Sequence, residues 1–390
     1  MATKLPGGGV TDATSTAGLP GVLRLGGAPL PVLDRARLYV CGITPYDVTH
    51  LGHAATFVWV DTLVRVLGAV GTEVAVCRNV TDVDDVLSVA ARRAGTRYDE
   101  FAAVRQFYFD RDMRRLAVRQ PAFEPRAHCY INQVMRIAQA LLDADRAYVS
   151  AGSVYFRGAA AVAGAGLGEG DAGREEAVRL LTEYGGHPDD PAKRDPFDSP
   201  VWQSSGPDDP AWDSPWGPGR PGWHAECAAM ALSTFGPAID VHAGGKDLAF
   251  PHHAYESAMV EAVTGVIPFA RRWMHVGVVG VGGVKMAKST GNLVLVADLV
   301  ERYPGAALRL LVLDRPWARD WDFDVADLDR AAGRLDGLCA AAGRRGGSEA
   351  AEDEVTTALL DDLDVPRALR VAEEAGGAAA RSATTVLGLV

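Results

Sequence analysis

The stretch LYVCGITPYDVTHLGHAATFV, residues 38–58, joins an apolar strand to a helix through a turn that carries a cysteine and two histidines. Before the turn, RLYVCG at 37–42 has the apolar character of a buried strand. After it, TFVWVDTLVRVLGAV at 56–70 has helical periodicity, and TEVAVCRNV at 72–80 has the pattern of the next strand. This order predicts a βαβ unit with a parallel sheet, so we expect an α/β fold.

Length and composition are typical of a globular protein with more than one domain. The chain has 390 residues, more than one hydrophobic core usually serves, and 48% of them are hydrophobic. The sequence has no run of 18 or more apolar residues that could span a bilayer, and residues 1–21 lack the apolar segment of a signal peptide. We therefore expect a cytoplasmic protein without a membrane partner, with residues 1–30 as a loose lead-in.

The rest of the chain predicts an α/β domain at 31–295, an insertion within it, and a helical region at 296–390. Residues 82–145 carry helical periodicity and are followed by AYVSAGSVYF, which resembles a hairpin, so we interpret the region around 82–160 as the insertion. Residues 183–222 are rich in Pro, Gly, Asp and Trp and have too little periodicity for regular elements. Because tryptophans argue against disorder, this segment is interpreted as an ordered, irregular loop over a site.

Two short motifs point to phosphate chemistry. HLGH, His50 to His53, lies between a strand and a helix start, where free backbone N–H groups favour a phosphate and Gly52 allows adenine to approach the backbone. KMAKS carries Lys285 and Lys288, which could clamp a pyrophosphate leaving group. Taken singly, HLGH could also be a polar helix cap, and KMAKS could also be a solvated lysine-rich loop. Their presence in one chain favours nucleotide binding.

Together the motifs resemble the HIGH and KMSKS signatures of class I aminoacyl-tRNA synthetases, and the flanking sequence looks most like the cysteinyl branch. Within that branch, GGHPDDPAKRDPFDSPVW, WGPGRPGWHAEC and FPHHAYESAMVEAVTG are most similar to the mycothiol cysteine ligase family. The likeness runs from about residue 30 to 330. It implies a Rossmann-like catalytic domain with a helical insertion and a C-terminal helical domain. It also implies three substrates, L-cysteine, ATP and glucosaminyl-inositol, with Mg²⁺ accompanying ATP.

The cysteines suggest a metal site rather than disulfides. They are odd in number and widely spaced: Cys41, Cys77, Cys129, Cys227 and Cys339. Cys41, Cys227 and His252 would give zinc two thiolates and an imidazole, leaving a position open for the thiolate of a substrate cysteine. The alternative is that the two cysteines are buried apolar residues and His252 a core histidine. The family resemblance favours zinc, because all three residues fall on ligand positions of its pattern.

The resemblance also assigns residues to the two small substrates. It places four residues around the bound cysteine, as hydroxyl, carboxylate and aromatic contacts: Thr44, Thr81, Trp223 and Asp247. The resemblance assigns the catalytic roles to His50, His53, Lys285 and Lys288. The ATP-binding residues it implies are Gly42, Gly52, Lys285 and Lys288. Each of the cysteine contacts could otherwise be a turn or packing residue.

Two residues depart from the expected pattern. Ala287 stands where the lysine signature has serine, which removes a hydroxyl but keeps both cations, so slower activation is expected rather than loss. Glu256 follows His252 by four residues, on the same helical face, and could be a fourth metal ligand. The resemblance implies such a glutamate in cysteinyl-tRNA synthetases, whereas three protein ligands are expected in mycothiol ligases.

Several functions remain open at this stage. The favoured one is a ligase that forms cysteinyl-adenylate and passes the cysteinyl group to the amine of glucosaminyl-inositol. A cysteinyl-tRNA synthetase is less favoured, because only about 100 residues follow KMAKS and the formal net charge is −11. The others are a paralogue that cysteinylates another amine and a silent paralogue that binds cysteine or zinc. We expect a monomer that acts without tRNA.

Overall fold

The computed structural model describes residues 22–46, 48–207, 209–286 and 290–390. Its centre is a parallel four-stranded sheet whose neighbouring strands are, in order, β10 (Ala270–Val276), β9 (Ile239–Gly245), β3 (Arg35–Ile43) and β4 (Glu73–Val80). Helix α1 (Leu51–Ala69) connects β3 to β4. The predicted βαβ unit is therefore confirmed, as is the Rossmann-like α/β fold class.

The parallel sheet separates two hydrophobic cores. Because successive side chains of a strand point to opposite faces, Leu38 and Val40 of β3 join one core, and Tyr39 and Cys41 join the other. The first core contains α1 and the C-terminal helices. The helices of the second core include α7 (Trp223–Phe235) and α8 (Ala254–Thr264). The alternation of side chains along β3 therefore places Cys41 on the face of the sheet that is covered by α7 and α8.

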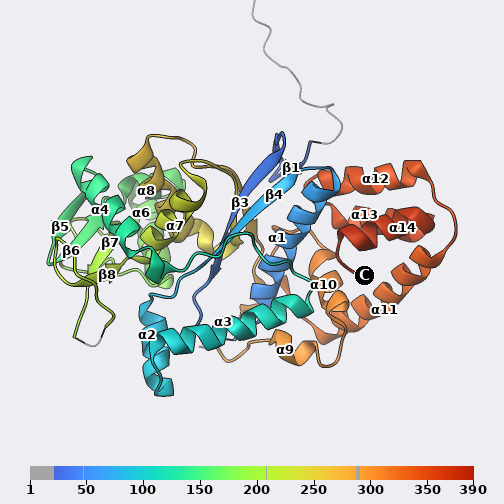
Figure 1. The fold of residues 1–390 in the computed structure, drawn as a ribbon, viewed down its shortest axis with the longest axis horizontal. Helices are drawn as coiled ribbons and strands as arrows, with labels where there is room; N and C mark the ends of the chain where they lie inside the picture. The colour runs from blue at the N-terminus through green and yellow to red at the C-terminus, as the bar shows by residue number, and fades with distance from the viewer. Residues whose placement is uncertain (1–21, 47, 208, 287–289) are drawn as a thin grey trace, which may run out of the picture.

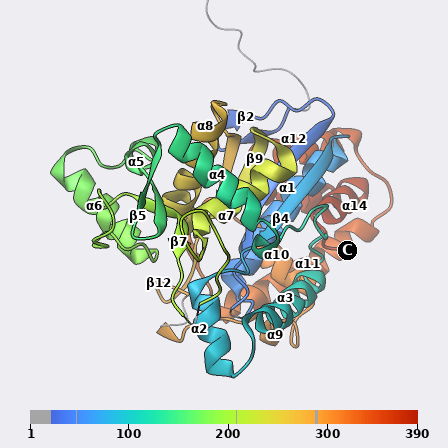
Figure 2. The same ribbon diagram turned by 60° about the vertical axis from the view of Figure 1, so that its left-hand side comes forward.

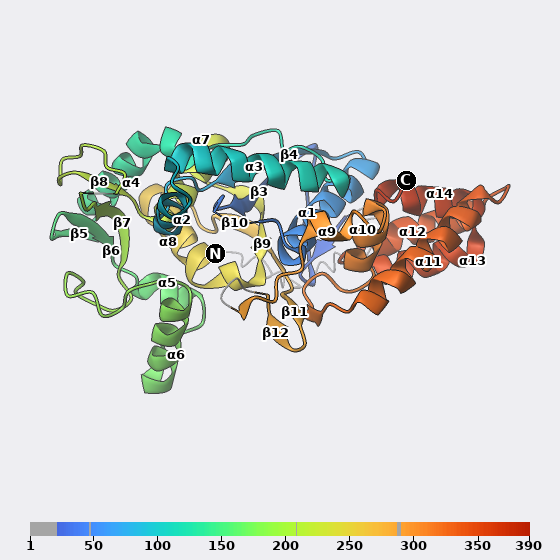
Figure 3. The same ribbon diagram turned by 90° about the horizontal axis from the view of Figure 1, so that it is seen from below.

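A second, antiparallel sheet lies at the opposite end of the molecule from the C-terminal helices (Figures 1 and 3). Its strands follow one another in chain order: β5 (Ala147–Ser150), β6 (Ser153–Phe156), β7 (Ser199–Ser204) and β8 (Gly219–Pro221). The hairpin expected in AYVSAGSVYF is β5–β6. The Pro- and Trp-rich segment 183–222 was expected to have no regular elements, yet it contains β7 and β8. Their pairing is set by the long-range contact of β7 with β6, which a local pattern does not encode.

Helices fill the C-terminal part of the chain, as predicted. They are α9 (Val296–Leu299), α10 (Gly305–Leu313), α11 (Val325–Gly343), α12 (Glu349–Leu360), α13 (Val365–Ala375) and α14 (Gly377–Val386). Figure 2 shows α11, α12 and α14 on the side of the parallel sheet away from α5 (Ala159–Gly164) and α6 (Gly170–Glu183). Helix α10 packs against α1 and so joins this region to the central sheet.

The remaining helices and strands complete the described chain. The helical ones are α2 (Asp85–Ala94), α3 (Tyr98–Arg115), η1 (Ala127–Cys129), α4 (Ile131–Asp143), η2 (Lys246–Leu248) and the π-helical turn η3 (Ala249–His253). The extended ones are β1 (Arg24–Leu25), β2 (Ala28–Pro29), β11 (Val279–Val281), β12 (Val284–Lys285) and β13 (Trp321–Asp322). Among the helices of the described residues, none has both the length and the apolar character needed to cross a membrane.

A buried ion pair ties α1 to α10. The Asp61 carboxylate accepts from the guanidinium of Arg309, which is fully buried, and it also pairs with Arg65 and Arg119. Burial by itself would raise the pKa of Asp61, but Arg309 and Arg65 outweigh it and hold that pKa below its usual value. Arg309 also donates to the backbone carbonyl of Leu387, near the C-terminal end of the chain.

We expect Asp61→Asn to lower the free energy of unfolding by roughly 2–3 kcal/mol, because it leaves the buried Arg309 cation without a charged partner. Denaturant unfolding measures the change. The matched control is Glu73→Gln, which removes an exposed pair with Arg35 and should cost under about 1 kcal/mol. Equal losses in the two variants would show that the Asp61 pair does not stabilise the fold.

Candidate active site

One cavity of ≈520 Å³ gathers nearly all of the predicted site residues. It lies where the parallel strands end at their carboxyl termini and α1 begins, the usual binding position in open α/β sheets. The predicted residues that line it are Cys41, Gly42, Thr44, His50, Gly52, His53, Thr81, Trp223, Cys227, Asp247, His252 and Lys285. Glu256 is buried beside the cavity without lining it. Lys288 and Ala287 lie outside the described residues.

The HLGH motif forms the N-terminus of α1. His50 is the N-cap residue, with an extended backbone, and its Nδ1 accepts from the backbone N–H of Gly52 at 3.1 Å. The rings of His50 and His53 stack with their centroids 3.8 Å apart. A side chain at position 52 would come within 2.9 Å of the His50 ring, so glycine there lets the cap close tightly. Both imidazoles thus stand at a helix N-terminus facing the cavity.

The predicted metal ligands come from four separate elements and meet in the second core. The cluster consists of Cys41 on β3, Cys227 on α7, His252 in η3 and Glu256 on α8, and their ligand atoms all lie within 4.8 Å of one another. His252 Nε2 is 3.2 Å from Cys227 Sγ, and Glu256 Oε2 is 3.9 Å from Cys41 Sγ. The four residues therefore form a possible metal-binding cluster.

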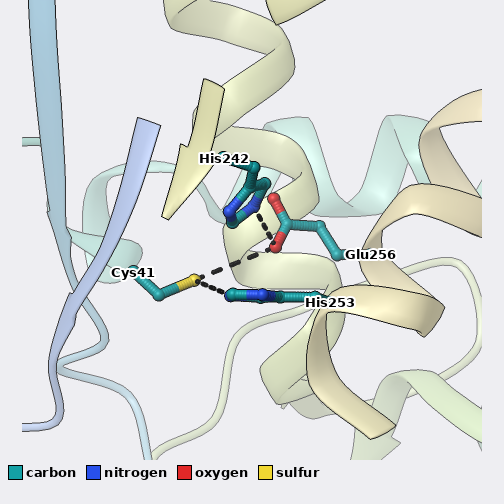
Figure 4. A group of neighbouring side chains, drawn as sticks. All are labelled: Cys41, His242, His253 and Glu256. Carbon is teal, nitrogen blue, oxygen red and sulfur yellow. Dashed lines mark hydrogen bonds and ion pairs between the residues drawn. The ribbon is translucent and has the colours of Figure 1, made fainter. Parts of the chain in front are cut away.

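A second group shares two members with the first and was missed by sequence reasoning. Figure 4 shows Glu256 Oε2 between Cys41 and His242, with His253 below. His253 Nε2 is 3.3 Å from Cys41 Sγ, and His242 Nε2 is 3.0 Å from Glu256 Oε2. The signal available in the sequence was the pair of adjacent histidines, His252 and His253, and a histidine inside the apolar strand β9.

The donor atoms of the cluster fit a soft divalent cation such as zinc. Glu256 Oε1 is buried and has no hydrogen-bond partner among the described residues, so one carboxylate oxygen is available to a cation. Burial lowers the pKa of His252 well below its usual value, which keeps the imidazole neutral as a ligand must be. Burial raises the pKa of the Cys41 thiol, and Cys227 adds to the shift. A nearby cation would favour the thiolate and oppose this rise.

Asn79, at the end of β4, positions one of these thiols and was also missed. Its Nδ2 donates to Cys227 Sγ at 3.2 Å, and its Oδ1 accepts from the backbone N–H of Gly42 at 2.8 Å. A Cβ at position 42 would lie 1.8 Å from the Asn79 carbonyl oxygen. Glycine at 42 therefore allows β3 and β4 to approach closely beside Cys227. This gives Gly42 a structural role in addition to its predicted contact with ATP.

The residues predicted to hold the substrate cysteine fall into two places. Thr44 and Thr81 meet through their hydroxyls, 2.7 Å apart, and the Trp223 ring stacks on His252 with centroids 4.1 Å apart. Asp247 instead pairs with the Lys285 ammonium at 2.7 Å. Its contact with a substrate ammonium stays a prediction. The Lys285 ammonium also lies over the ring of Tyr184, 5.4 Å from its centroid, a contact that no sequence motif indicated.

Comparison with known proteins agrees with this architecture. Residues 31–333 match the family described as tRNA synthetases class I (C) catalytic domain. Among solved structures, a methionyl-tRNA synthetase of Mycobacterium tuberculosis in complex with methionyl-adenylate has a TM-score of 0.59 at 17% identity, covering 92% of this chain and 82% of that chain. A leucyl-tRNA synthetase of Agrobacterium radiobacter has a TM-score of 0.62 at 10% identity, covering 91% and 82%. Likenesses at such identities show the fold alone.

Curated relatives are much closer in sequence. The chain is 41% identical over 360 residues to the L-cysteine:1D-myo-inositol 2-amino-2-deoxy-alpha-D-glucopyranoside ligase of Corynebacterium aurimucosum, covering 90% of this chain and 87% of that protein. It is 43% identical over 339 residues to the ligase of the same name from Streptomyces griseus, covering 86% and 82%.

The fold and the family match define a catalytic domain of the class I aminoacyl-tRNA synthetase type. The chain belongs to the mycothiol cysteine ligase family within that class, as its motifs predicted.

Proposed function

We propose that the protein joins L-cysteine to the amine of glucosaminyl-inositol through a cysteinyl-adenylate, with ATP converted to AMP and pyrophosphate. The observation that carries the proposal is a single cavity lined by Cys41, Cys227 and His252 together with HLGH and Lys285. The two cysteines and His252 suit a metal ion that binds a cysteine thiolate, and HLGH with Lys285 suits a triphosphate. The names of the relatives supply the sugar acceptor.

In the first step, a carboxylate oxygen of cysteine attacks the α-phosphorus of ATP and pyrophosphate leaves. His50 and His53 at the N-terminus of α1 would bind the phosphates, and Lys285 would stabilise charge on the leaving group. Zn²⁺ held by Cys41, Cys227 and His252, with Glu256 as a fourth donor, would supply a Lewis-acid position that favours a thiolate over a hydroxyl. Thr44, Thr81 and Trp223 would form the wall around the amino acid.

In the second step, the neutral amine of the sugar attacks the carbonyl carbon of the adenylate. The C–N bond forms, the bond to AMP breaks, and the amine proton passes to solvent or a base. The acceptor must therefore reach the carbonyl from the open side of the cavity. Tyr184, at the start of the Pro- and Trp-rich segment 183–222, contacts the ammonium of the cavity residue Lys285, and Trp223, which follows the segment, lines the cavity, so we propose this segment as the cover for that side.

In the decisive experiment, the full-length protein is incubated with L-cysteine, ATP and a panel of acceptors, and the products are identified by mass spectrometry. We expect an amide with glucosaminyl-inositol and no cysteinyl-tRNA, since the formal net charge of −11 disfavours a polyanion. Comparable transfer of radiolabelled cysteine to tRNA would favour a cysteinyl-tRNA synthetase instead. Reaction only with a different amine would identify a paralogue with another acceptor.

The two steps should differ in pH dependence. The His53 ring is half-buried at the cavity wall, and desolvation together with His50 lowers its pKa to about 3. Burial tends to lower the pKa of Lys285, but Asp247 outweighs it and raises that pKa above its usual value. His53 therefore stays neutral and Lys285 charged across neutral pH. We expect cysteine-dependent ATP–pyrophosphate exchange to vary less than about twofold between about pH 6.5 and 8.5.

Amide formation should instead rise with pH, by up to about tenfold per unit below the pKa of the acceptor amine, because only the neutral amine attacks. Single-turnover transfer from preformed adenylate measures this step. A flat profile for transfer, or a steep one for exchange, would contradict the assignment of the two steps.

A further inference from the structure

A cysteine outside the cavity is joined to a histidine and a buried aspartate. Cys129 is exposed at the end of η1, and its Sγ is 3.2 Å from Nε2 of His128. The other ring nitrogen of His128, Nδ1, is 2.6 Å from Oδ2 of Asp82. Asp82 is buried and comes from the segment after β4, far from η1 in the sequence. The three side chains form a continuous thiol–imidazole–carboxylate relay, and none of them lines the cavity.

The Asp82 carboxylate determines the direction of proton transfer in this relay. Asp82 in its ionised form can only accept hydrogen bonds, so the neutral His128 ring carries its proton on Nδ1. Nε2 is then free of hydrogen and accepts from the Cys129 thiol. Asp82 also accepts the backbone N–H of His128 through Oδ1 at 3.0 Å, which fixes the residue as well as its ring. The histidine is therefore oriented to take the thiol proton.

The relay is accessible to solvent and has a cationic side chain beside its carboxylate. The His128 side chain is 44% exposed, so solvent and small molecules reach the pair. Arg126 lies 3.7 Å from Asp82 and adds a positive charge next to the relay. Once His128 has taken the thiol proton, the thiolate stands beside an imidazolium, which is a setting of reactive cysteines.

We propose that Cys129 is a nucleophilic thiol that undergoes exchange with small disulfides and so becomes S-thiolated. In the exchange, His128 Nε2 takes the thiol proton and the Cys129 sulfur attacks one sulfur of a disulfide such as L-cystine. A new S–S bond forms as the old one breaks, and the departing thiolate receives the proton from His128. Excess free thiol reverses the step by the same route. This proposal does not depend on the proposed function, because the modification requires no turnover.

Cys339 serves as an internal control for the effect of solvent exposure on the reaction rate of a cysteine. Cys339 on α11 is also exposed, and no imidazole or carboxylate of the described residues lies within hydrogen-bond distance of its sulfur. Cys41, Cys77 and Cys227 are buried. A difference in rate between Cys129 and Cys339 therefore reports the relay rather than simple access.

The test treats the full-length native protein with L-cystine, stops the reaction with acid, and follows each cysteine by peptide mass. We expect Cys129 to acquire a cysteinyl adduct about tenfold or more faster than Cys339. His128→Gln should bring Cys129 to within about threefold of Cys339, since an amide can bond to Asp82 but cannot take the proton. Asp82→Asn should also slow the reaction, because its amide no longer fixes the tautomer of His128.

Repeating the measurement with iodoacetamide, which is not a disulfide, separates nucleophilicity from recognition of cystine. The same ratio of Cys129 to Cys339 is expected with both reagents. Equal rates at the two cysteines of the wild-type protein would overturn the proposal. So would an undiminished rate at Cys129 in both His128→Gln and Asp82→Asn, each verified as folded by circular dichroism.

Discussion

If zinc occupies the proposed site, replacing Cys227 with alanine is expected to abolish zinc binding in the purified protein and to lower cysteine-dependent ATP–pyrophosphate exchange by about 10³-fold. Structural zinc sites contribute about 10–16 kcal/mol over four ligands, so one thiolate accounts for roughly 2.5–4 kcal/mol of affinity. The Cys227 sulfur faces His252 at 3.2 Å, and no other described cysteine can take its place in that group. Metal content per chain and the exchange rate are the two measurements.

Cys77→Ala is the matched control. Cys77 is as buried as Cys227 and belongs to the same core, but it is in neither candidate metal group. The same atoms are removed, so both variants should lose comparable packing, while only Cys227→Ala should lose zinc. Full zinc content in Cys227→Ala would refute the ligand assignment.

A further variant distinguishes the two overlapping groups. Cys227 and His252 belong to one of them, and His242 and His253 belong to the other. If the first group holds the ion, His242→Ala should keep zinc whereas His252→Ala should lose it. The reverse result would place the ion between Cys41, His242 and His253.

Lys285→Ala should reduce the exchange rate by about 10²- to 10³-fold while leaving zinc content unchanged. Loss of one preorganised charge from the leaving group costs about 2.7–4 kcal/mol of transition-state stabilisation. The structure adds a second reason. Asp247 pairs with Lys285 at 2.7 Å and lines the same cavity, so the variant leaves an unpaired carboxylate where the triphosphate is expected.

Lys246→Ala provides the control for removing a lysine from an ion pair. Lys246 is the neighbour of Asp247 in the chain and forms an exposed pair with Asp320 at 2.8 Å, but it does not line the cavity. Its exchange rate should stay within about twofold of the wild-type rate. If Lys246→Ala and Lys285→Ala slowed exchange equally, Lys285 would have no specific role in the step.

The sequence alone predicted the class of fold and the family, because both depend on local patterns. The alternation of strand and helix around residues 38–80 specified the βαβ unit, and HLGH lies within it, at the junction of β3 and α1. The period of two along β3 also decided that Cys41 faces away from the core that holds Leu38 and Val40. The segment at 183–222 was harder, since its strands are short and pair with β6 across a long insertion.

Only the tertiary structure decided which side chains meet. Cys41 and Glu256 are 215 residues apart in the sequence, yet their Sγ and Oε2 atoms are 3.9 Å apart. His242 and His253 form a second candidate metal group with Cys41 and Glu256, and this grouping appears only in the folded chain. The structure also pairs Asp247 with Lys285, a contact that no motif indicated, while the predicted contact of Asp247 with the substrate ammonium stays a prediction. The physical reason is that the periodicity of a strand or helix determines which of its faces a side chain is on. Contacts between elements depend on how sheets and helices pack against one another, and this packing is not determined by residues that are neighbours in the chain.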